Sequence, residues 1–135
     1  MSMLSLEIIT PERLVLQEEV DMVEARGEMG EFGILPGHIK FLTTIDIGEI
    51  RYFKGDKRKH IATSGGFAEV VEDKVTVLVE TAELAEEIDI ERAKRAKDRA
   101  ESALRDLAAD ADEYRLHELA LLRAITRISA ASQRA

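Results

Sequence analysis

The chain has no cysteine among its 135 residues, and this absence removes several kinds of site at once. Without thiols it can form neither a disulfide framework nor a thiolate metal site, and it has no cysteine nucleophile. It also lacks an apolar run near the ~18 residues that span a bilayer, and its start lacks the segments of a secretory signal. We therefore expect an intracellular protein that meets a membrane only through a partner.

Glycine and proline are missing from the second half of the chain. All eight glycines and both prolines lie at or before Gly66. Because these two residue types punctuate regular structure, the chain divides into a turn-rich part, residues 1–87, and a part without strong breakers, residues 88–135. We expect each part to form a domain of its own.

The first part has the alternating pattern of β-strands. Apolar residues alternate with polar ones over Leu4–Ile8 and again over Val75–Val79, which predicts strands with one buried face. Lys54–Lys57 has the composition of a hairpin turn, and Gly65-Gly66 predicts a bend or a close backbone approach before a strand at Phe67–Val71. Several short strands at this spacing predict an all-β antiparallel sandwich or barrel.

The second part has the spacing of amphipathic helices. Alanine and leucine recur three and four residues apart over 93–107, and apolar residues recur over 116–128, which predicts two helices packed as an antiparallel hairpin. Residues 108–113 interrupt the pattern, and Asp110 with Glu113 has the spacing of a capping box that would begin the second helix. Since the junction has no glycine or proline, one continuous helix of about 42 residues, roughly 63 Å long, stays an open alternative.

Charge is unevenly distributed along the chain. The formal net charge is −8 at pH 7, which argues against nonspecific nucleic-acid binding. Residues 1–87 contain 9 Lys+Arg and 18 Asp+Glu, whereas residues 88–135 contain 10 and 9. A slightly basic end on an acidic body indicates that this end meets an anionic surface or ligand.

Four arginines of the second part are spaced so that they share helix faces. Arg92 and Arg99 are seven residues apart, and Arg123 and Arg127 are four apart. In an antiparallel hairpin the two pairs would converge, and a phosphate-bearing ligand would relieve their repulsion through charge-assisted hydrogen bonds. Ordinary solvated arginines on a helix surface are the alternative.

Two acids precede the first predicted helix. Asp89 stands at its N-cap position, and recognition of a ribose hydroxyl or an amino group is the alternative role. Glu83 is expected to be a solvated acid on the linker, near enough to the hairpin for ligand contact. We expect no metal site and no catalytic site, because the three histidines lack metal-ligand spacing and neither a nucleophile elbow nor a phosphate loop is present.

The segment from Gly30 to His38 reads G-E-F-G-I-L-P-G-H. Three glycines and a proline within nine positions specify a particular loop shape. Glu31 and Phe32 are reasonable interface residues, and His38 follows Pro36-Gly37 at the expected tip of the loop. We predict that this loop contacts a partner.

The same segment resembles the signature of the epsilon subunit of bacterial and chloroplast F-type ATP synthase. Thr10-Pro11, Ser64–Phe67 with Glu69-Val70, and Val75–Leu78 support the resemblance, which extends in order over essentially the whole chain. It implies a ten-stranded β-sandwich followed by a C-terminal two-helix hairpin. It also implies a non-catalytic rotor subunit of the central stalk that contacts the gamma subunit and the c-ring through Glu31, Phe32, Gly33 and His38.

The run Ile88-Asp89-Ile90-Glu91-Arg92-Ala93 is similar to the family's ATP-binding pattern, Ile/Leu-Asp-x-x-Arg-Ala. The resemblance implies a regulatory ATP and no catalytic cofactor. In the family, ATP favours the folded hairpin, whereas the extended hairpin contacts an acidic segment of the catalytic beta subunit and inhibits ATP hydrolysis. The implied ligand residues are Glu83, Ile88, Asp89, Arg92, Ala93, Arg99, Arg123 and Arg127.

The implied function is to couple proton-driven rotation to ATP synthesis and to regulate ATP hydrolysis. The subunit would work with the gamma, beta and alpha subunits and the c-ring, at the cytoplasmic face of the bacterial inner membrane. Two alternatives stay open. One is a stalk subunit with a purely structural hairpin and no useful ATP binding, and the other is a free-standing nucleotide-binding sensor.

Overall fold

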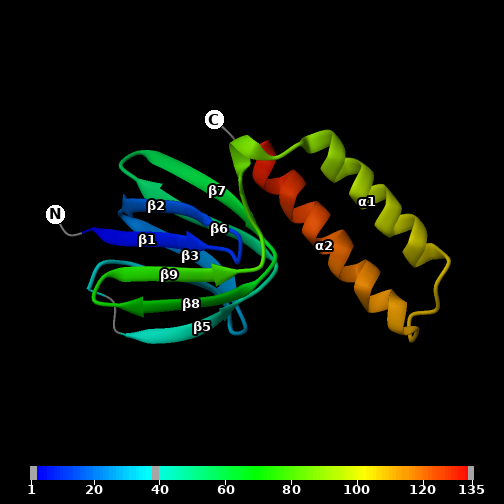
Figure 1. The fold of residues 1–135 in the computed structure, drawn as a ribbon, viewed down its shortest axis with the longest axis horizontal. Coiled ribbons are helices and arrows are strands. Elements are labelled where there is room, and N and C mark those ends of the chain that lie inside the picture. The colour runs from blue at the N-terminus through cyan, green and yellow to red at the C-terminus, as the bar shows by residue number, and fades with distance from the viewer. Residues whose placement is uncertain (1–2, 38–39, 134–135) are drawn as a thin grey trace.

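A two-layer β-sandwich with a helical hairpin beside it forms the molecule (Figure 1). The computed structural model describes residues 3–37 and 40–133. The resemblance's expectation of ten strands followed by two helices is confirmed. The first sheet holds, in spatial order, β2 (Leu14–Val20), β1 (Leu4–Ile9), β9 (Lys74–Val79), β8 (Gly66–Val71) and β5 (Phe41–Ile45).

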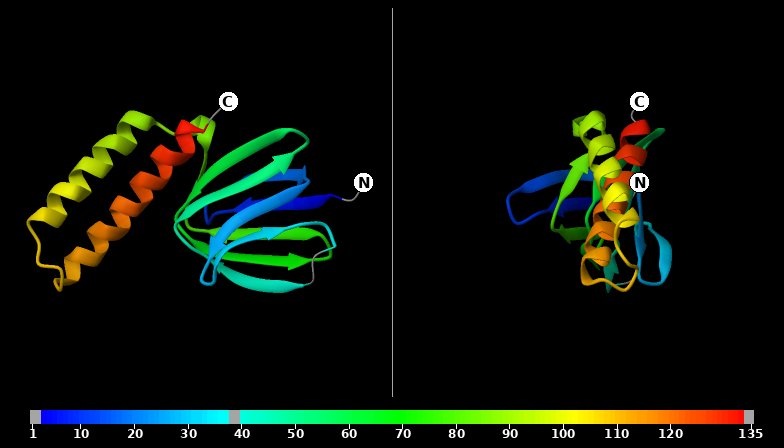
Figure 2. Two further views of the ribbon diagram at one scale, coloured as in Figure 1. Left: turned by 180° about the vertical axis from the view of Figure 1, so that it is seen from behind. Right: turned by 90° about the vertical axis from the view of Figure 1, so that its right-hand side faces the viewer.

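The second sheet faces the first and carries the helical hairpin at its outer side (Figures 1 and 2). Strands β1 and β9 pair in parallel, and the other neighbours in both sheets run antiparallel. The parallel pair departs from the all-antiparallel expectation. The second sheet holds, in spatial order, β10 (Ala82–Leu84), β7 (Lys57–Thr63), β6 (Gly48–Lys54), β3 (Met22–Gly27) and β4 (Gly30–Ile34).

The core lies between the two sheets and follows the period-two pattern of the sequence. Leu4, Leu6 and Ile8 of β1 are fully buried while their neighbours reach the outer face. Ile50 and Ile61 close the core from the second sheet. Each such side chain contributes about 1.5–3 kcal/mol by leaving water, so the sandwich carries most of the fold's apolar stabilisation.

Two predicted glycine features are confirmed. Gly55 lies in the tight turn between β6 and β7 with φ +64°, a conformation that glycine adopts at little cost. Gly66 begins β8, and a Cβ there would lie 2.0 Å from the carbonyl oxygen of Leu78. Strand β9 therefore approaches β8 as closely as it does because position 66 has no side chain.

The second part folds into the predicted antiparallel hairpin, so the single long helix is not the form seen here. After the 3-10 turn η1 (Ala85–Glu87) come α1 (Ile90–Arg105) and α2 (Asp112–Ser132). The predicted capping box is wrong: Ala111 is the N-cap of α2 and provides no side-chain cap. The helix starts one position later than a cap at Asp110 requires, because residues 108–111 close a turn of their own through Ala111 N–H to Ala108 C=O.

Helix α2 lies between α1 and the sandwich (Figures 1 and 2). Ala93 and Ala100 of α1 are buried, as the recurrence of alanine and leucine over residues 93–107 predicts, and Ala124 of α2 is buried as well. On its other side α2 packs Ala130 and Ala131 against the second sheet. Among the described residues, neither helix is long and apolar enough to cross a membrane.

Candidate functional site

A cleft of about 410 Å³ opens where the start of α1, the end of α2 and the segment around β10 meet. It contains six of the eight predicted ligand residues: Glu83, Asp89, Arg92, Ala93, Arg99 and Arg127. We call it the arginine cleft. Thr81, Glu87 and Ala96 complete its lining.

The arginine cleft mixes paired and unpaired charges. Arg127 Nε donates to Glu83 Oε1 at 2.6 Å, which joins α2 to β10. Arg92 and Arg99 reach the cleft from α1, and no ion pair joins either of them to a carboxylate of the described residues. Two guanidinium groups therefore remain available to an anion, and a third is engaged through its Nε by Glu83, whose carboxylate would compete with such an anion.

Glu83 differs from its expected role. It lies in strand β10 rather than on a free linker, and its side chain is 38% exposed and ion-paired with Arg127. The alternation of the preceding strand ends before Glu83, and its partner is 44 residues away. Local sequence therefore could not identify the pair.

Asp89 is the N-cap of α1, as predicted. Its Oδ1 accepts a hydrogen bond from the backbone N–H of Arg92 at 3.1 Å. This bond satisfies one of the free N–H groups at the start of the helix. The cap thus fixes the direction in which α1 leaves the sandwich, and it places Arg92 and Arg99 on the face that lines the cleft.

Ile88 and Arg123 are the two predicted ligand residues that do not line the arginine cleft. Ile88 is buried in a cluster with Ala62, Ala130 and Ala131, where it fastens α2 to the second sheet. Arg123 lines an adjoining small hollow with Arg127.

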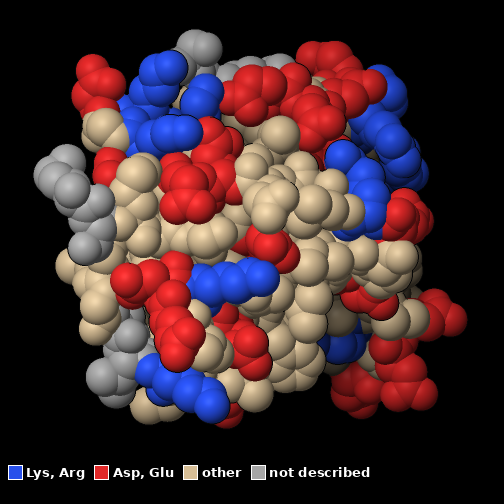
Figure 3. Space-filling view, turned by 60° about the vertical axis from the view of Figure 1, so that its left-hand side comes forward, with Lys and Arg blue, Asp and Glu red and all other residues tan. Residues whose placement is uncertain are grey.

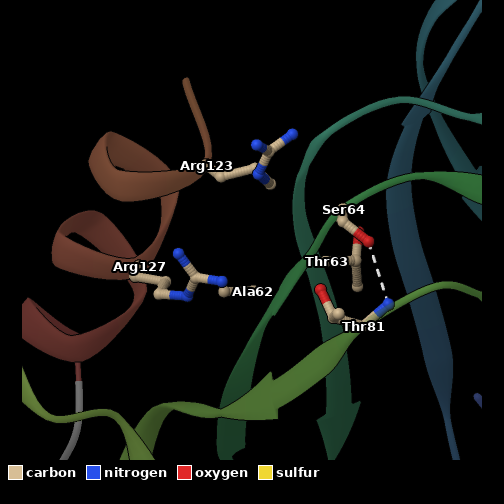
Figure 4. Close-up of a pocket in the computed structure, with 6 residues that line it drawn as sticks. All are labelled: Ala62, Thr63, Ser64, Thr81, Arg123 and Arg127. Atoms are coloured by element: carbon tan, nitrogen blue, oxygen red, sulfur yellow. Dashed lines mark hydrogen bonds between the residues drawn. The ribbon is translucent and has the colours of Figure 1, made fainter. Parts of the chain in front are cut away.

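Figure 4 shows this hollow between α2 and the strands. Arg123 and Arg127 project from α2 toward Ser64 and Thr81, whose hydroxyl and backbone N–H are joined at 2.9 Å. Thr81 lines both the hollow and the arginine cleft. The two spaces therefore adjoin, and an elongated anion could contact arginines of both.

Sequence reasoning missed three residues of the cleft. Ala96 lies one turn from Ala93 on the same face of α1, so helical spacing alone could have found it. Thr81 and Glu87 flank β10 and η1, and their positions depend on how the chain crosses from sandwich to hairpin. Among the residues that the structure describes, no group of three or more His, Asp or Glu side chains is placed to hold a metal ion.

The glycine-rich segment forms a second candidate site, but half of it is a strand. Residues Gly30–Ile34 are β4, paired with β3, so the expectation of a loop from Gly30 onward is corrected. A turn follows at Pro36-Gly37, where the backbone N–H of Gly37 donates to Asp73 at 2.7 Å. The prediction for His38 lies outside the described residues.

Glu31 of β4 is held by an arginine of β6, two strands away across β3. Arg51 of β6 donates to Glu31 at 2.8 Å and to Glu24 at 3.1 Å. Burial alone would lower the pKa of Arg51, but hydrogen bonds and charge from the two carboxylates raise it above its ordinary value. Glu31 is therefore fixed in position while its side chain stays 57% exposed.

Phe32 and Gly33 line an apolar cleft of about 380 Å³ beside Glu31. Phe32 meets Phe41 edge to face with ring centroids 6.1 Å apart. Met29, which is 97% exposed, and Leu42 widen the apolar surface. Three of the four predicted partner-contact residues thus lie on one surface, and an apolar partner segment with a basic rim would complement it.

Figure 3 shows the sandwich from the side that Figure 1 places at the left. Carboxylates are scattered over this face, and lysines and arginines lie singly or in small groups between them. No continuous basic surface is visible on this face, of the kind that binds a nucleic-acid backbone. The view agrees with the acidic balance of the chain.

Comparison with known families covers both parts of the chain. Residues 3–85 match "ATP synthase, Delta/Epsilon chain, beta-sandwich domain", and residues 86–132 match "ATP synthase, Delta/Epsilon chain, long alpha-helix domain". The chain belongs to the ATP synthase delta/epsilon family. Among its relatives, the ATP synthase epsilon chain of Geotalea uraniireducens is 52% identical over 132 residues, covering 98% of this chain and 96% of the relative. That of Nitratidesulfovibrio vulgaris strain DP4 is 53% identical over 125 residues, covering 93% and 92%.

Solved structures agree with this family. A chain of the Euglena gracilis mitochondrial ATP synthase, in a structure described as OSCP/F1/c-ring in rotational state 1, aligns with TM-score 0.81 and 26% identity. The alignment covers 95% of this chain and 81% of the Euglena chain. A chain from the central stalk and c-ring of the Tetrahymena thermophila enzyme shares the fold, with TM-score 0.65, 14% identity and coverage of 95% and 96%.

Proposed function

We propose that the chain is a non-catalytic rotor subunit of the central stalk of a proton-translocating ATP synthase. Family matches over both the sandwich and the hairpin support this proposal. So does the likeness to a chain of a structure that contains F1 and the c-ring. In this role the subunit transmits proton-driven rotation and performs no bond-making chemistry itself.

The partner surfaces follow from the two candidate sites. The surface with Glu31, Phe32 and Gly33, together with His38, is proposed to meet the gamma subunit and the c-ring. The hairpin is proposed to meet the alpha and beta subunits when it extends. With these contacts, the complex would hold the subunit at the cytoplasmic face of a bacterial inner membrane.

The hairpin is further proposed to respond to ATP. The observation that carries this proposal is that the arginine cleft takes Arg92 and Arg99 from α1 and Arg127 from α2. A triphosphate bound there would bridge the two helices and the sandwich, so it would stabilise the docked hairpin over any extended one. Loss of ATP would then favour the extended hairpin, which inhibits ATP hydrolysis.

A structural hairpin is the second candidate. The Glu83–Arg127 pair favours it, because this pair already neutralises one arginine of the cleft without a ligand. A phosphate would share or compete for Arg127 with the Glu83 carboxylate, and this competition lowers the net gain from binding. The two candidates therefore differ in one measurable quantity, the affinity of the full chain for ATP.

Calorimetry of the full chain with ATP tests the proposal. Arg99→Ala removes an arginine that lines the cleft and makes no ion pair with the described residues, so we expect ATP binding to weaken about tenfold. Arg95→Ala is the matched control, since Arg95 lies on the same helix outside the cleft and should leave the affinity unchanged. Absence of binding heat at millimolar ATP, or equal losses in both variants, would support the structural hairpin instead.

A further inference from the structure

A partly buried polar network joins α2 to the sandwich away from the arginine cleft. Glu49 of β6 bonds with its Oε1 to His60 Nδ1 of β7 at 2.7 Å, and its Oε2 accepts from the hydroxyl of Ser129 at 2.9 Å. The side chains of His60 and Glu49 are 7% and 16% exposed. None of the three residues lines the arginine cleft or the hollow beside it.

The chemistry of the network fixes its direction. A carboxylate offers only acceptors, so the ring nitrogen Nδ1 of His60 carries the hydrogen that Glu49 accepts. His60 lies on a strand of the same sheet, so it can hold the carboxylate in one orientation whether or not the helix is present. The second oxygen of Glu49 then faces α2, ready for the hydroxyl of Ser129.

This preorganisation affects how strongly α2 docks. A hydrogen bond to a charged group contributes more than a neutral one, and it loses less when its acceptor is already ordered. Arg51, which pairs in register with His60 on the same sheet, is engaged by Glu24 and Glu31 and does not bind Glu49. The carboxylate of Glu49 is therefore directed to one partner on the hairpin.

Two side-chain ties of helix α2 to the sandwich stand out among the described residues, and they differ in whether a ligand in the arginine cleft could reach them. The Arg127–Glu83 pair lies in the arginine cleft, so an anion bound there would compete with Glu83 for Arg127. The Ser129–Glu49 bond lies outside the cleft, so an anion bound in the cleft would not contact its partners. The two ties lie two positions apart along α2, at Arg127 and Ser129, close enough for one to hold the helix in register at the other.

We propose that Glu49 and His60 are positioning residues that latch α2 to the sandwich through Ser129. The latch sets the equilibrium between docked and released hairpin, and it keeps α2 in place while Arg127 passes from Glu83 to a bound anion. The docking equilibrium needs no ligand. The part that the latch plays during the exchange at Arg127 rests on the proposed nucleotide role.

Thiol labelling of the full chain reads the docking equilibrium directly, because the chain has no cysteine of its own. Ala130 is fully buried where α2 meets the sandwich, so a thiol introduced by Ala130→Cys reacts only when α2 leaves. In a second chain, Ala68→Cys places the thiol in the sandwich core, where it reports opening of the sandwich itself. The labelling rate of each thiol is proportional to the population of its open state.

Ser129→Ala is the test variant. We expect it to raise the labelling rate of the thiol at position 130 about tenfold without nucleotide, and to leave the thiol at position 68 unchanged. Ser132→Ala is the matched control, since the Ser132 hydroxyl bonds within its own helix and does not reach the sheet. Ser129→Thr keeps the hydroxyl and should restore most of the docking.

A second substitution separates the latch from general loosening. Glu49→Met should raise the rate at position 130 by itself, and Ser129→Ala should then add little, because their shared bond is already gone. Two results would overturn the latch. One is an equal rise of the labelling rate at position 130 in Ser129→Ala and Ser132→Ala. The other is a rise in the double variant Ser129→Ala, Glu49→Met that equals the two single effects combined. Since these arms contain no nucleotide, failure to bind ATP would contradict only the proposed regulatory role.

Discussion

Gly66→Ala is expected to lower the free energy of unfolding by about 3 kcal/mol, near the upper end of the usual cost of overpacking. The added Cβ would lie 2.0 Å from the carbonyl oxygen of Leu78 and 2.9 Å from the Cα of Val79. These are backbone atoms of β9, so no side-chain rotation can relieve the clash. Strand β9 would have to move away from β8 and disturb the centre of the first sheet. Urea unfolding followed by circular dichroism measures the loss.

Gly48→Ala is the control for that experiment. Position 48 also begins a strand, but a Cβ there would come no closer than 4.0 Å to its nearest neighbour, the carbonyl oxygen of Asp46. The substitution also restricts the unfolded chain, so we expect no loss of stability. If both variants unfold at the same urea concentration, the close approach of β8 and β9 is not what requires glycine.

Ala130→Leu is expected to release the hairpin while the sandwich stays folded. Ala130 is fully buried against Ala62 and Ile88, and a leucine there overfills the contact at a cost of about 1–3 kcal/mol. The interface of α2 with the second sheet has few other apolar contacts, whereas the sandwich core lies elsewhere. The strain should therefore be relieved by undocking rather than by unfolding.

Spin labels on Asp56→Cys and Asp110→Cys report this release, because both positions are exposed and lie on the sandwich and the hairpin respectively. The parent chain should give one narrow distance, and the variant should add a broad component from the released hairpin. Ser132→Leu adds similar bulk at an exposed position of the same helix and should keep the narrow distance. A narrow distance in Ala130→Leu would show that the contact accommodates the larger side chain.

Most of the fold could be predicted because strand burial, helix caps and tight turns depend on residues that are close together in the sequence. The alternation of Leu4, Leu6 and Ile8 predicts which face of β1 is buried, and these three residues are the buried ones. The helix cap at Asp89 depends on a residue three positions along the chain, so it too was visible in the sequence. The same holds for the turn at Gly55.

Long-range pairings were beyond the sequence. Glu83 meets Arg127, and Glu49 meets Ser129, only after the hairpin has folded back onto the sheet. Strand β10 has three residues, too few to show a period. The start of α2 was misplaced because a turn at residues 108–111 uses the backbone groups that a cap at Asp110 would need.

The candidate site could be predicted only in part, because some of its residues follow from helical spacing and others depend on packing. Helical spacing put Arg92 and Arg99 on one face, and the antiparallel hairpin brought Arg127 to them. Ile88 and Arg92 belong to the same ATP-binding pattern, but the side chain of Ile88 is buried in the contact with α2. A motif therefore identifies the segment that forms the site, while packing decides which of its side chains reach the ligand.

The most direct test of an ATP-responsive hairpin is the labelling rate of the thiol at Ala130→Cys as ATP is added to the full chain. If ATP binds the docked hairpin and bridges its helices, the labelling rate should be divided by one plus the ratio of the ATP concentration to its dissociation constant. Arg99→Ala should shift this fall to higher ATP, and Arg95→Ala should not. A labelling rate that stays constant up to millimolar ATP would contradict the account.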